Sequence, residues 1–465
     1  MQPSRTGPNI IDDTIVAIST PPGRGGIGIV RLSGPDAIAI ATPMLRLKSP
    51  LAHSVARFAE ILDPETQGDG RIDEAVVTLF AAPNSYTGED VVEIAAHGSP
   101  VVLDLLLRLA VARGARLADP GEFTQRAFLS GRIDLTQAEA VRDLIDAQTL
   151  YQARVAAGQL GGALSNRIQP AKDALIELIA IIEAGIDFAE DDIDVVPNAE
   201  ILNRIESIAA QLALVEASFA QGRIVQSGLT LAIVGRPNVG KSSLFNRLVE
   251  RERAIVTAAP GTTRDLVTET VSLGGIPVHL IDTAGLREAS DEAEAIGIQK
   301  SRETLADADI IIVVMDATAQ DVTQEAELIA TLEGRQSVVV LNKIDLLDET
   351  GELAFPHRTG LPVPIPISAK TGAGIAELRE KILTLARGPA GEGQSGMITN
   401  LRQYQAVSAS IRSLRAAASS TARSIPHEMV MLDLYAALRD LDALTGQTTP
   451  DDILSQIFST FCIGK

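Results

Sequence analysis

The sequence predicts a multidomain protein in which an α+β domain comes first and is followed by an all-α domain that an α/β domain interrupts. At 465 residues, the chain is longer than one hydrophobic core usually organises. Its hydrophobic periodicity changes from short alternating runs to three- and four-residue spacing, and then to buried strands that alternate with helices. Helical periodicity returns near the end. The economical interpretation is a discontinuous helical domain with an insertion, because an inserted domain leaves its host fold intact.

These changes set the expected boundaries. Residues 1–120 carry β-branched runs such as TIVAI and DVVEIAAH between glycine and proline turns, which is typical of a strand-rich domain with one or two helices. Long amphipathic stretches fill residues 121–221, the first part of the helical domain. In residues 222–388, apolar strands such as LTLAIVG and IIIVVMD alternate with helical segments, as in a doubly wound parallel sheet. The flexible stretch GPAGEGQSG leads into residues 389–465, the second helical part.

The composition is that of an ordinary soluble globular protein, with 46% hydrophobic and 3% aromatic residues. A formal net charge of -20 argues against nucleic-acid binding by bulk electrostatics, so any RNA contact must be local. The single cysteine excludes an intrachain disulfide and suits a reducing compartment. We see no signal segment and no apolar run of the roughly 18 residues that span a membrane, so we expect a cytoplasmic protein.

A phosphate-binding loop is expected between a strand and a helix of the inserted domain. Gly235, Gly240, Lys241 and Ser242 stand in G-x-x-x-x-G-K-S spacing directly after LTLAIV. Backbone N–H groups of such a loop converge on nucleotide phosphates, the lysine adds a positive charge, and the serine hydroxyl can ligate Mg²⁺. A turn that uses its glycines only for geometry is the alternative for this motif alone. Four further motifs in the right order argue against it.

Two of these motifs indicate which base is bound. In NKID, the carboxylate of Asp345 can accept hydrogen bonds from the N1–H and amino groups of guanine, whereas adenine would leave that acceptor unpaired. Asn342 and Lys343 are expected to brace the base and the loop. Residues 368–370, the sequence SAK, would supply a backbone contact to the base. The sequence therefore favours GTP over ATP, and a solvated loop carboxylate is the alternative for an isolated N-K-x-D.

The other two motifs are expected to sense the γ-phosphate. GTTRD at residues 261–265 positions Thr263 to bind Mg²⁺ and the γ-phosphate. DTAG at residues 282–285 places Asp282 near the metal and the Gly285 N–H near the γ-phosphate. A glycine–threonine turn and an aspartate at a strand end are the alternatives, and the order and spacing of the motifs favour the nucleotide site.

The water-activating residue is not fixed by the residues alone. Leu286 follows DTAG at the position where Ras-like GTPases carry a glutamine, and its side chain has no polar atom. The acidic stretch that follows supplies four candidates, which the sequence itself does not rank: Glu288, Asp291, Glu292 and Glu294. A mobile, solvated loop is the alternative for each of them.

The sequence resembles the family of tRNA modification GTPases known as MnmE or TrmE across essentially its full length. The blocks that carry the resemblance include TPPGRGGIGIVRLSG, PGEFTQRAFLSGRIDLTQAEAV, GRPNVGKSSLFN, DTAGLREASDEAEAIGI and the terminal FCIGK. The resemblance implies a Ras-like, potassium-dependent GTPase that is activated when two G domains dimerise. A cation at that place would offset the negative charge that develops during phosphoryl transfer.

The resemblance also implies roles for particular residues. Asn238 would ligate potassium with backbone carbonyls of Thr257, Ala259 and Thr262, and Glu294 would activate water. Without the resemblance, Asn238 is as well explained as a loop-capping residue. Motifs and resemblance together place the following residues around GTP: Asn238, Val239, Gly240, Lys241, Ser242, Ser243, Thr257, Ala258, Ala259, Pro260, Gly261, Thr262, Thr263, Asp282, Thr283, Ala284, Gly285, Asn342, Lys343, Asp345, Ser368, Ala369 and Lys370.

For the first domain, the resemblance implies a folate-binding-like fold that holds a one-carbon donor and forms a constitutive homodimer. The donor would be 5-formyl- or 5,10-methylene-tetrahydrofolate, and the residues that match the family's contacts are Arg31, Glu93, Arg132 and Lys465. A guanidinium can pair with a folate carboxylate, and a glutamate can accept from the pterin. Family members often carry lysine at the position of Arg132, and the two side chains differ in geometry. By itself, Arg31 would be taken as a solvated charge on a strand.

The implied function is formation of the carboxymethylaminomethyl or aminomethyl group on C5 of the wobble uridine in certain tRNAs. The implied partner, in a heterotetramer, is a flavin-dependent protein of the glucose-inhibited division A type. GRGGIG at residues 23–28 lacks the strict dinucleotide-binding register, which is consistent with redox chemistry in the partner. Residues 400–465 contain six basic and six acidic residues, so no basic stripe marks an RNA surface there.

Cys462 is a further catalytic candidate, because the family requires its C-terminal cysteine for tRNA modification. The ending CIGK is a poor prenylation signal, and an isolated apolar thiol is more often inert packing. Two other functions compete with tRNA modification. A ribosome-assembly or translation-associated GTPase would share the nucleotide motifs but not the first 220 residues or FCIGK, and a non-catalytic nucleotide switch would hydrolyse GTP slowly and without regard to potassium.

Overall fold

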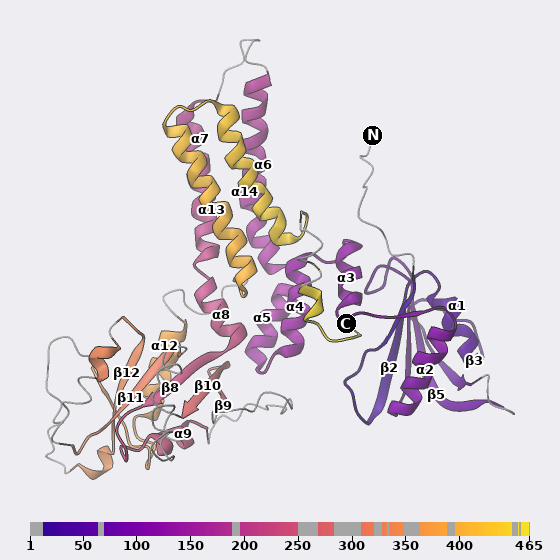
Figure 1. The fold of residues 1–465 in the computed structure, drawn as a ribbon, viewed down its shortest axis with the longest axis horizontal. Helices are drawn as coiled ribbons and strands as arrows, with labels where there is room; N and C mark the ends of the chain where they lie inside the picture. The colour runs from indigo at the N-terminus through magenta and orange to yellow at the C-terminus, as the bar shows by residue number, and fades with distance from the viewer. Residues whose placement is uncertain are drawn as a thin grey trace, which may run out of the picture. The chain divides into compact units, whose positions relative to one another are not determined.

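In the computed structural model, the chain forms two compact units (Figure 1). Unit 1 comprises Met1–Arg142 and Asp442–Lys465, and unit 2 comprises Asp143–Leu441. The structure describes residues 13–63, 69–187, 196–249, 268–282, 308–319, 328–332, 334–347, 363–387, 396–448, 454 and 457–464.

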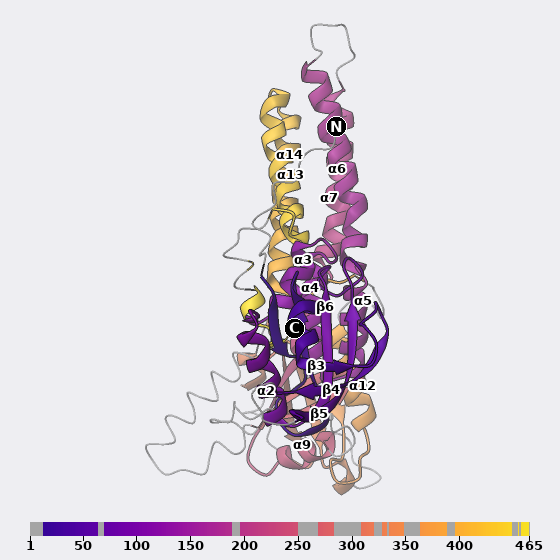
Figure 2. The same cartoon turned by 90° about the vertical axis from the view of Figure 1, so that its right-hand side faces the viewer.

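Unit 1 is built on a seven-stranded sheet with strand order β3-β4-β5-β6-β2-β1-β7 (Figure 2). The strands pair antiparallel except β1 and β7, which are parallel. The elements are β1 Ile15–Ile18, β2 Gly25–Ser33, α1 Ala37–Ala41, η1 Thr42–Met44, β3 Leu45–Leu47, β4 Ala56–Leu62, β5 Arg71–Phe80, β6 Val91–Gly98, α2 Pro100–Ala112, β7 Arg116–Leu117, α3 Glu122–Leu129 and α4 Leu135–Asp146. The expected strand-rich texture with one or two helices is confirmed for residues 13–120, where α1 and α2 accompany the strands.

One face of this sheet carries the core of unit 1. Residues that alternate along β2, such as Val30 and Leu32, are fully buried with Leu106 of α2. Gly28 permits this packing, because a Cβ there would lie 2.4 Å from a methyl carbon of Leu103 in α2. Alternation along the strands leaves the opposite face only partly covered, as expected of an antiparallel sheet.

A buried guanidinium fixes α3 against β1. The side chain of Arg126 is 5% exposed and donates to Asp13 Oδ1 at 2.6 Å, to Glu122 Oε1 at 3.0 Å and to Glu89 Oε1 at 3.1 Å. Arg116 donates to Glu122 as well, with Nη2–Oε1 at 2.6 Å. Burial raises the pKa of Asp13 and of Glu122, but the hydrogen bonds from the two arginines outweigh it and hold both pKa values below their usual range.

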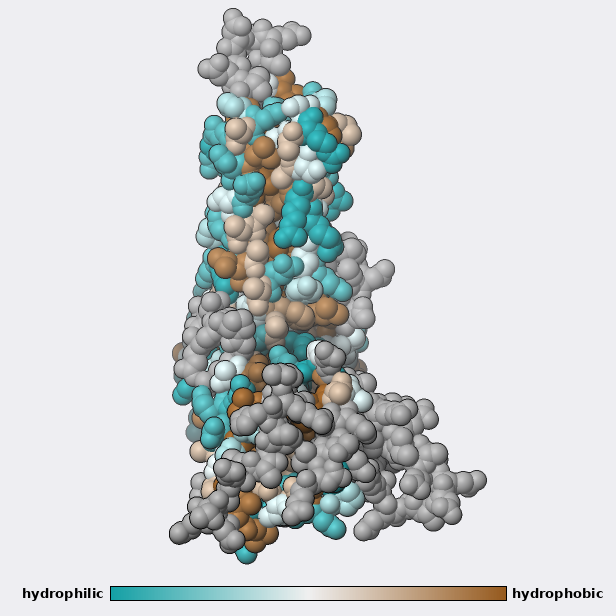
Figure 3. Space-filling view, turned by 90° about the vertical axis from the view of Figure 1, so that its left-hand side faces the viewer, coloured by the Kyte–Doolittle hydropathy of each residue, from teal (hydrophilic) through white to brown (hydrophobic). Residues whose placement is uncertain are grey.

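The helices of unit 2 come from both sides of the α/β segment. They are α5 Leu150–Leu160, α6 Ala163–Asp187, α7 Asn198–Glu216, α8 Phe219–Ser227, α13 Leu401–Ala422 and α14 His427–Thr445. α7 is linked to α14 by His427 Nε2 and Asn198 Oδ1, 2.9 Å apart. It is linked to α13 by Ser408, which donates to Glu216. Figure 3 shows hydrophilic residues over much of this helical part on one side, between narrower hydrophobic stripes.

The α/β segment of unit 2 contains a six-stranded sheet with strand order β13-β12-β11-β8-β10-β9. Among the strands that the structure describes here, β9 and β10 pair antiparallel and the other neighbours pair parallel. Its elements are β8 Leu229–Val234, α9 Lys241–Val249, β9 Thr268–Leu273, β10 Ile276–Asp282, β11 Ile310–Asp316, β12 Ser337–Asn342, η3 Ile344–Leu346, β13 Ile365–Pro366 and α12 Ile375–Arg387. The expected doubly wound parallel sheet is confirmed for β8, β10, β11, β12 and β13, which lie where the apolar runs predict strands. The sequence did not predict β9, which adds an antiparallel strand at the edge.

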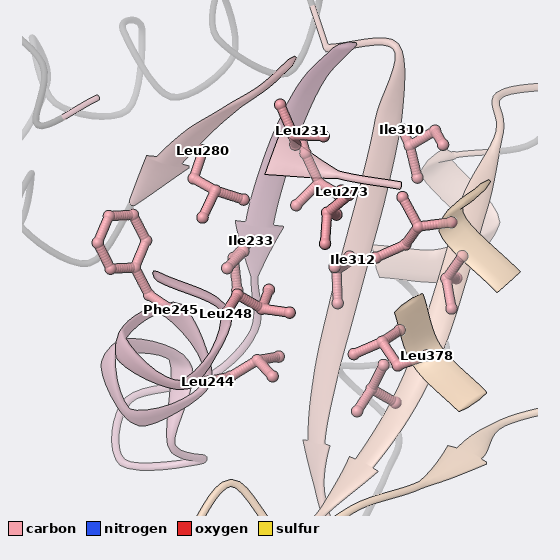
Figure 4. Close-up of a cluster of buried hydrophobic side chains, with 14 of the residues drawn as sticks. Leu231, Ile233, Leu244, Phe245, Leu248, Leu273, Leu280, Ile310, Ile312 and Leu378 are labelled. Atoms are coloured by element: carbon pink, nitrogen blue, oxygen red, sulfur yellow. The ribbon is translucent and has the colours of Figure 1, made fainter. Parts of the chain in front are cut away.

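Apolar side chains cover both faces of this sheet, which explains why its strands are almost continuously hydrophobic. On one face, Leu231 and Ile233 of β8 meet Leu244 and Leu248 of α9 (Figure 4). Alternate residues of the same strands, such as Ala232 and Val313, belong to a second cluster. Burial of a leucine side chain contributes about 1.5–3 kcal/mol, so these clusters hold the carboxyl ends of β8, β11 and β12 in a fixed arrangement.

Candidate functional site

The loop between β8 and α9 requires glycine at two positions. Gly235 has φ +149°, and a Cβ there would lie 2.2 Å from the carbonyl oxygen of Val314 in β11. Gly240 has φ +96°, and a Cβ there would lie 2.2 Å from Asn342 Nδ2. The motif glycines therefore serve a close approach of this loop to the ends of β11 and β12. That edge is where parallel α/β sheets bind ligands.

Lys241 is the first residue of α9, and its side chain folds back over the loop. Its Nζ donates to the carbonyl oxygens of Gly235 at 3.1 Å and of Arg236 at 2.8 Å. Ser242 and Ser243 lie exposed in the first turn of α9, and Asn238 is an exposed residue with φ +64°. Positive charge and the N-terminal amides of a helix thus gather at one loop, an arrangement suited to anions.

Asn342 at the end of β12 joins this loop to the segment after β13. Its Nδ2 donates to the carbonyl oxygen of Val239 at 2.8 Å, and its Oδ1 accepts from the Ala369 N–H at 2.9 Å. Asn342 is 2% exposed, so both amide bonds are made away from water. Since a lost buried hydrogen bond costs about 1–3 kcal/mol, this side chain fixes the distance between the two loops.

The NKID and SAK segments meet through Asp345 and Ser368. Ser368 Oγ donates to Asp345 Oδ1 at 2.6 Å and accepts from the Thr371 N–H at 3.0 Å. Ser368 is fully buried, whereas Asp345 is exposed. The serine therefore orients a carboxylate that keeps acceptor capacity toward solvent, as recognition of a base with two adjacent N–H donors would need.

Arg247 in the last turn of α9 also holds the SAK segment, and the sequence analysis missed it. Its Nε donates to the carbonyl oxygen of Ala369 at 2.9 Å, and its Nη2 donates to that of Lys370. One planar guanidinium therefore binds two successive carbonyls. No spacing rule marks an arginine six residues after the motif lysine, so only the structure reveals this contact.

Lys343 and Asp316 form a second contact that the sequence analysis missed. Lys343 has φ +68°, and its Nζ lies 2.6 Å from Asp316 Oδ2 at the end of β11. Burial raises the pKa of Asp316, but hydrogen bonds from Lys343 and Thr318 outweigh it and hold that pKa below its usual value. The sequence did offer one signal for Asp316, which is a polar residue at the carboxyl end of a buried strand.

Several expected site residues lie outside the described residues: Thr257, Ala258, Ala259, Pro260, Gly261, Thr262, Thr263, Thr283, Ala284, Gly285, Glu288, Asp291, Glu292, Glu294 and Lys465. Asp282 ends β10, and its side chain is also outside them. Within the described ranges, no group of three or more His, Cys, Asp or Glu side chains is placed to hold a metal ion. No helix in the described part of the chain is long and apolar enough to cross a membrane.

A separate charged cluster lies on the sheet of unit 1. Arg31 of β2 pairs in register with Glu93 of β6, and its Nη2 lies 2.7 Å from Glu93 Oε1. The guanidinium carbon is 5.6 Å from the ring centre of Phe123 and 5.9 Å from that of Tyr86. The Gly464 carbonyl accepts from Arg31 Nη1 at 3.4 Å. The structure thus brings Arg31 and Glu93 together beside the residue that precedes Lys465.

Arg132 and Cys462 occupy other positions in unit 1. Arg132 Nη1 donates to the Pro83 carbonyl at 2.9 Å, and among the described residues it bonds neither Arg31 nor Glu93. Cys462 has an exposed side chain, and its carbonyl accepts from the Gly121 N–H at 3.4 Å. The aromatic rings of Phe458 and Phe461, 5.5 Å apart and buried, anchor the segment before and around this cysteine.

Comparisons with known proteins cover both units. Residues 14–132 match the family model described as GTP-binding protein TrmE N-terminus, and residues 135–462 match that of the MnmE helical domain. The tRNA modification GTPase MnmE of Koribacter versatilis is 61% identical over 98% of this chain and 100% of its own length. That of Carboxydothermus hydrogenoformans is 43% identical with the same coverage. The G domain of the T. maritima FeoB iron transporter is 29% identical over 34% of this chain and 98% of its own, with a TM-score of 0.26, too low to compare the folds.

Proposed function

Because this chain belongs to the MnmE family of tRNA modification GTPases, we propose that it binds GTP at the loops after β8, β12 and β13 and hydrolyses it during tRNA modification. The observation that carries this proposal is the bridge from Val239 through Asn342 to Ala369. It joins the loop expected to bind phosphates to the segment expected to bind guanine. The bridge therefore fixes the distance between the phosphate end and the guanine end of a bound nucleotide.

The contacts suggest how each part of GTP would be held. Amide groups of the loop before α9 and the Lys241 ammonium would bind the phosphates, and Asp345 would accept from guanine. Mg²⁺ would be held by Ser242 and Thr263 and would neutralise phosphate charge. The exposed Ser242 hydroxyl in the first turn of α9 fits this role, since it stands beside the expected phosphate position.

We further propose that hydrolysis depends on potassium and on dimerisation of the G domains. Asn238 would ligate K⁺ together with backbone carbonyls of Thr257, Ala259 and Thr262, and Glu294 would take a proton from water. The exposed, left-handed Asn238 supports this, because its side chain is available at the rim of the loop. A bound monovalent cation would supply positive charge at the transferring phosphate.

Turnover in potassium chloride against sodium chloride, at equal ionic strength, tests this mechanism. We expect much faster GTP hydrolysis in potassium, and we expect Asn238→Ala to lose that advantage while still binding GTP. Equal rates in the two salts would contradict the potassium-dependent mechanism but not GTP binding.

For unit 1 we propose a homodimer that binds a tetrahydrofolate one-carbon donor. On the outer sheet face, Phe58 and Val76 are directly opposite each other in β4 and β5 and are 54% and 47% exposed. The next row of the same face runs through Thr78 and Glu93 to Arg31. An exposed apolar pair beside a charged pair would suit a dimer contact with a ligand at its edge.

Calorimetry with 5-formyltetrahydrofolate and sedimentation of the full chain test these two proposals. We expect binding heat that Arg31→Ala abolishes and that Arg108→Ala, on the exposed side of α2, retains. We expect Phe58→Asp to shift the protein toward monomer. Absence of heat for the unaltered chain would contradict the folate site, and a monomeric unaltered chain would contradict the homodimer.

The tRNA product and the partner complete the proposal. Together with a flavin-dependent protein of the glucose-inhibited division A type, the chain would install the (carboxymethyl)aminomethyl group on C5 of wobble uridine, with Cys462 taking part. Mass spectrometry of tRNA from cells that lack this chain should show wobble uridine without the group. If the amount of modified wobble uridine in these cells were unchanged and ribosome assembly were defective, the result would favour a ribosome-assembly GTPase instead.

A further inference from the structure

The charge of α13 differs in sign from the net charge of the chain as a whole. Between Leu401 and Ala422 it contains no aspartate or glutamate, although the chain as a whole has 60 acidic residues and a net charge of -20. Arg402, Arg412 and Arg415 lie within the helix, and Arg423 is its C-cap. The equal numbers of acidic and basic residues over 400–465 do not reveal this positive helix, because all the acidic residues of that range follow position 427.

The arginines lie on a face that is open in unit 2. The buried side of α13 includes Val407, Leu414 and Ala417, which are seven and three residues apart and so lie on one face of the helix. Arg412, Arg415 and Arg423 are exposed, and the other exposed residues of the helix are Leu401, Gln405, Ala416, Ser419 and Ala422. We call this set, with the three arginines, the α13 face. It offers guanidinium, amide and hydroxyl groups but no carboxylate.

Two of these arginines keep their donors for a ligand. Within the described part of the chain, Arg412 and Arg415 make no hydrogen bond and no ion pair within 4 Å, whereas Arg423 donates to Ser419 Oγ at 2.7 Å. Arg412 is near Asp440 of α14, whose pKa is raised by burial against the opposing effect of Arg439 and Arg412.

Two of the three carboxylates of the neighbouring helix α7 bond groups other than the α13 arginines. Glu216 accepts from Ser408, and Glu200 pairs with Arg204, whose Nη2 lies 2.9 Å from its Oε1. Arg204 also pairs with Glu177 of α6 at 3.1 Å. Glu206, the third, is exposed and makes no hydrogen bond or ion pair with the α13 arginines within the described residues. The α13 face therefore remains a local positive surface.

We propose that the α13 face binds the phosphate backbone of the tRNA substrate, an inference that rests on the proposed function only for the identity of the RNA. Backbone contacts in nucleic-acid complexes come from arginine, serine and glutamine side chains, which are the polar groups this face presents. Arginine forms forked hydrogen bonds to phosphate oxygens. Because the rest of the chain is strongly acidic, repulsion elsewhere would orient the RNA toward this face.

The contacts that this face offers do not depend on the nucleotide sequence of the RNA. Arg412 and Arg423 are eleven residues apart and lie on one line of the helix, about 16 Å from each other along its axis. No exposed aromatic residue on the face is available to stack on a base, as sequence-specific recognition of single strands usually requires. The face would therefore hold the tRNA body, and the choice of nucleotide would be made elsewhere.

The test compares Arg412→Ala/Arg415→Ala with Arg154→Ala, an exposed arginine of α5, in the full-length protein. Fluorescence anisotropy with a tRNA that has a uridine at the wobble position gives the dissociation constant at several potassium chloride concentrations. We expect the double variant to bind roughly tenfold or more weakly and its salt dependence, as log K against log[salt], to fall by about 1.5. We expect the Arg154→Ala control to match the unaltered chain.

GTP turnover without tRNA, measured in parallel, should be the same in all three proteins. A double variant with unchanged tRNA affinity and salt slope would overturn the inference. So would a double variant that keeps tRNA affinity but no longer binds the flavin-dependent partner, because the face would then serve a protein. If the unaltered chain neither hydrolyses GTP nor binds tRNA, the proposed function itself fails. That result differs from a loss of tRNA affinity in the double variant alone.

Discussion

The two charged sites of the molecule are held together in different ways. In unit 2, Asn342, Ser368 and Arg247 connect loops that leave one edge of a parallel sheet, and most of these bonds end on backbone atoms. In unit 1, Arg31 is held by a carboxylate one strand away and by the carbonyl of Gly464, 433 residues distant in sequence. The first site is made by short loops on a rigid edge, whereas the second depends on the chain end reaching the sheet.

This difference determines what each site tolerates. Loops fixed by backbone bonds keep their shape when an exposed side chain changes, but they fail when a glycine acquires a Cβ. A cluster of paired side chains responds to loss of any one charge, since the partner then stays half-buried and unpaired.

The largest effect is expected from Gly240→Ala. The added Cβ would lie 2.2 Å from Asn342 Nδ2 at a φ of +96°, so the loop cannot stay beside β12. We expect GTP binding to fall below detection by calorimetry. Gly372→Ala is the matched control, because it has φ +90° but no atom within 4 Å of the added Cβ. That variant should lose only about 1 kcal/mol of stability and keep its GTP affinity; similar losses in both would refute the steric explanation.

The next largest effect is expected from Arg126→Met in unit 1. Removal of this buried cation leaves Asp13, Glu89 and Glu122 without their shared partner, and we expect a loss of about 3–5 kcal/mol in unfolding free energy. Calorimetry of the full chain would detect this as a lowered unit 1 transition. An unchanged transition would mean that Arg116 alone satisfies the carboxylates.

The same cluster predicts a pH dependence. Asp13 and Glu122 have lowered pKa values, so their contribution is complete above the unfolded values near pH 4 and is lost as the pH falls through the folded ones. Unit 1 should therefore lose stability below about pH 4, with a smaller loss in Arg126→Met. Equal slopes in the two proteins would exclude this cluster as the cause.

Sequence patterns were sufficient for the sheet of unit 2 and for the grouping of its loops. Apolar runs fixed β8, β11 and β12, and residues at the carboxyl ends of parallel strands must meet at one edge. Asn342 and Asp345 could therefore be placed near Gly240 from spacing alone. Arg247 could not, because its contact depends on the rotation of α9 over the sheet, which no local motif encodes.

In unit 1 the sequence alone was less informative. The strands were predictable. Arg31 and Glu93 lie on different strands, however, and only the β2–β6 register makes them neighbours. The resemblance named both, yet neither periodicity nor resemblance indicated that Tyr86 and Phe123 flank the guanidinium. The α13 face was likewise hidden, because a count over a long segment averages out the separation of charges along it.

Asp345→Asn sharpens the comparison at the base-binding end of the unit 2 site. An amide has one acceptor oxygen and no charge, so it cannot offer a separate oxygen to each guanine donor. Loss of charged hydrogen bonds of about 1.5–3 kcal/mol should weaken GTP binding by about 100-fold. Xanthine has a carbonyl in place of the guanine amino group, so xanthosine triphosphate should bind the variant better than GTP does. If the variant preferred GTP as strongly as the unaltered chain, Asp345 would not contact the base.

The smallest effect is expected from Arg247, which touches only the support of the base-binding segment. Arg247→Ala frees the carbonyls of Ala369 and Lys370, so the segment gains freedom that GTP binding must then remove. We expect GTP affinity to fall about fivefold to tenfold, with turnover at saturating GTP unchanged, because the phosphate loop keeps its own contacts. Arg247→Lys preserves the charge but not the fork and should recover only part of the affinity. A fall in maximal turnover at unchanged affinity would instead mean that Arg247 supports the phosphate end, and the division between the two ends of the site would have to be redrawn.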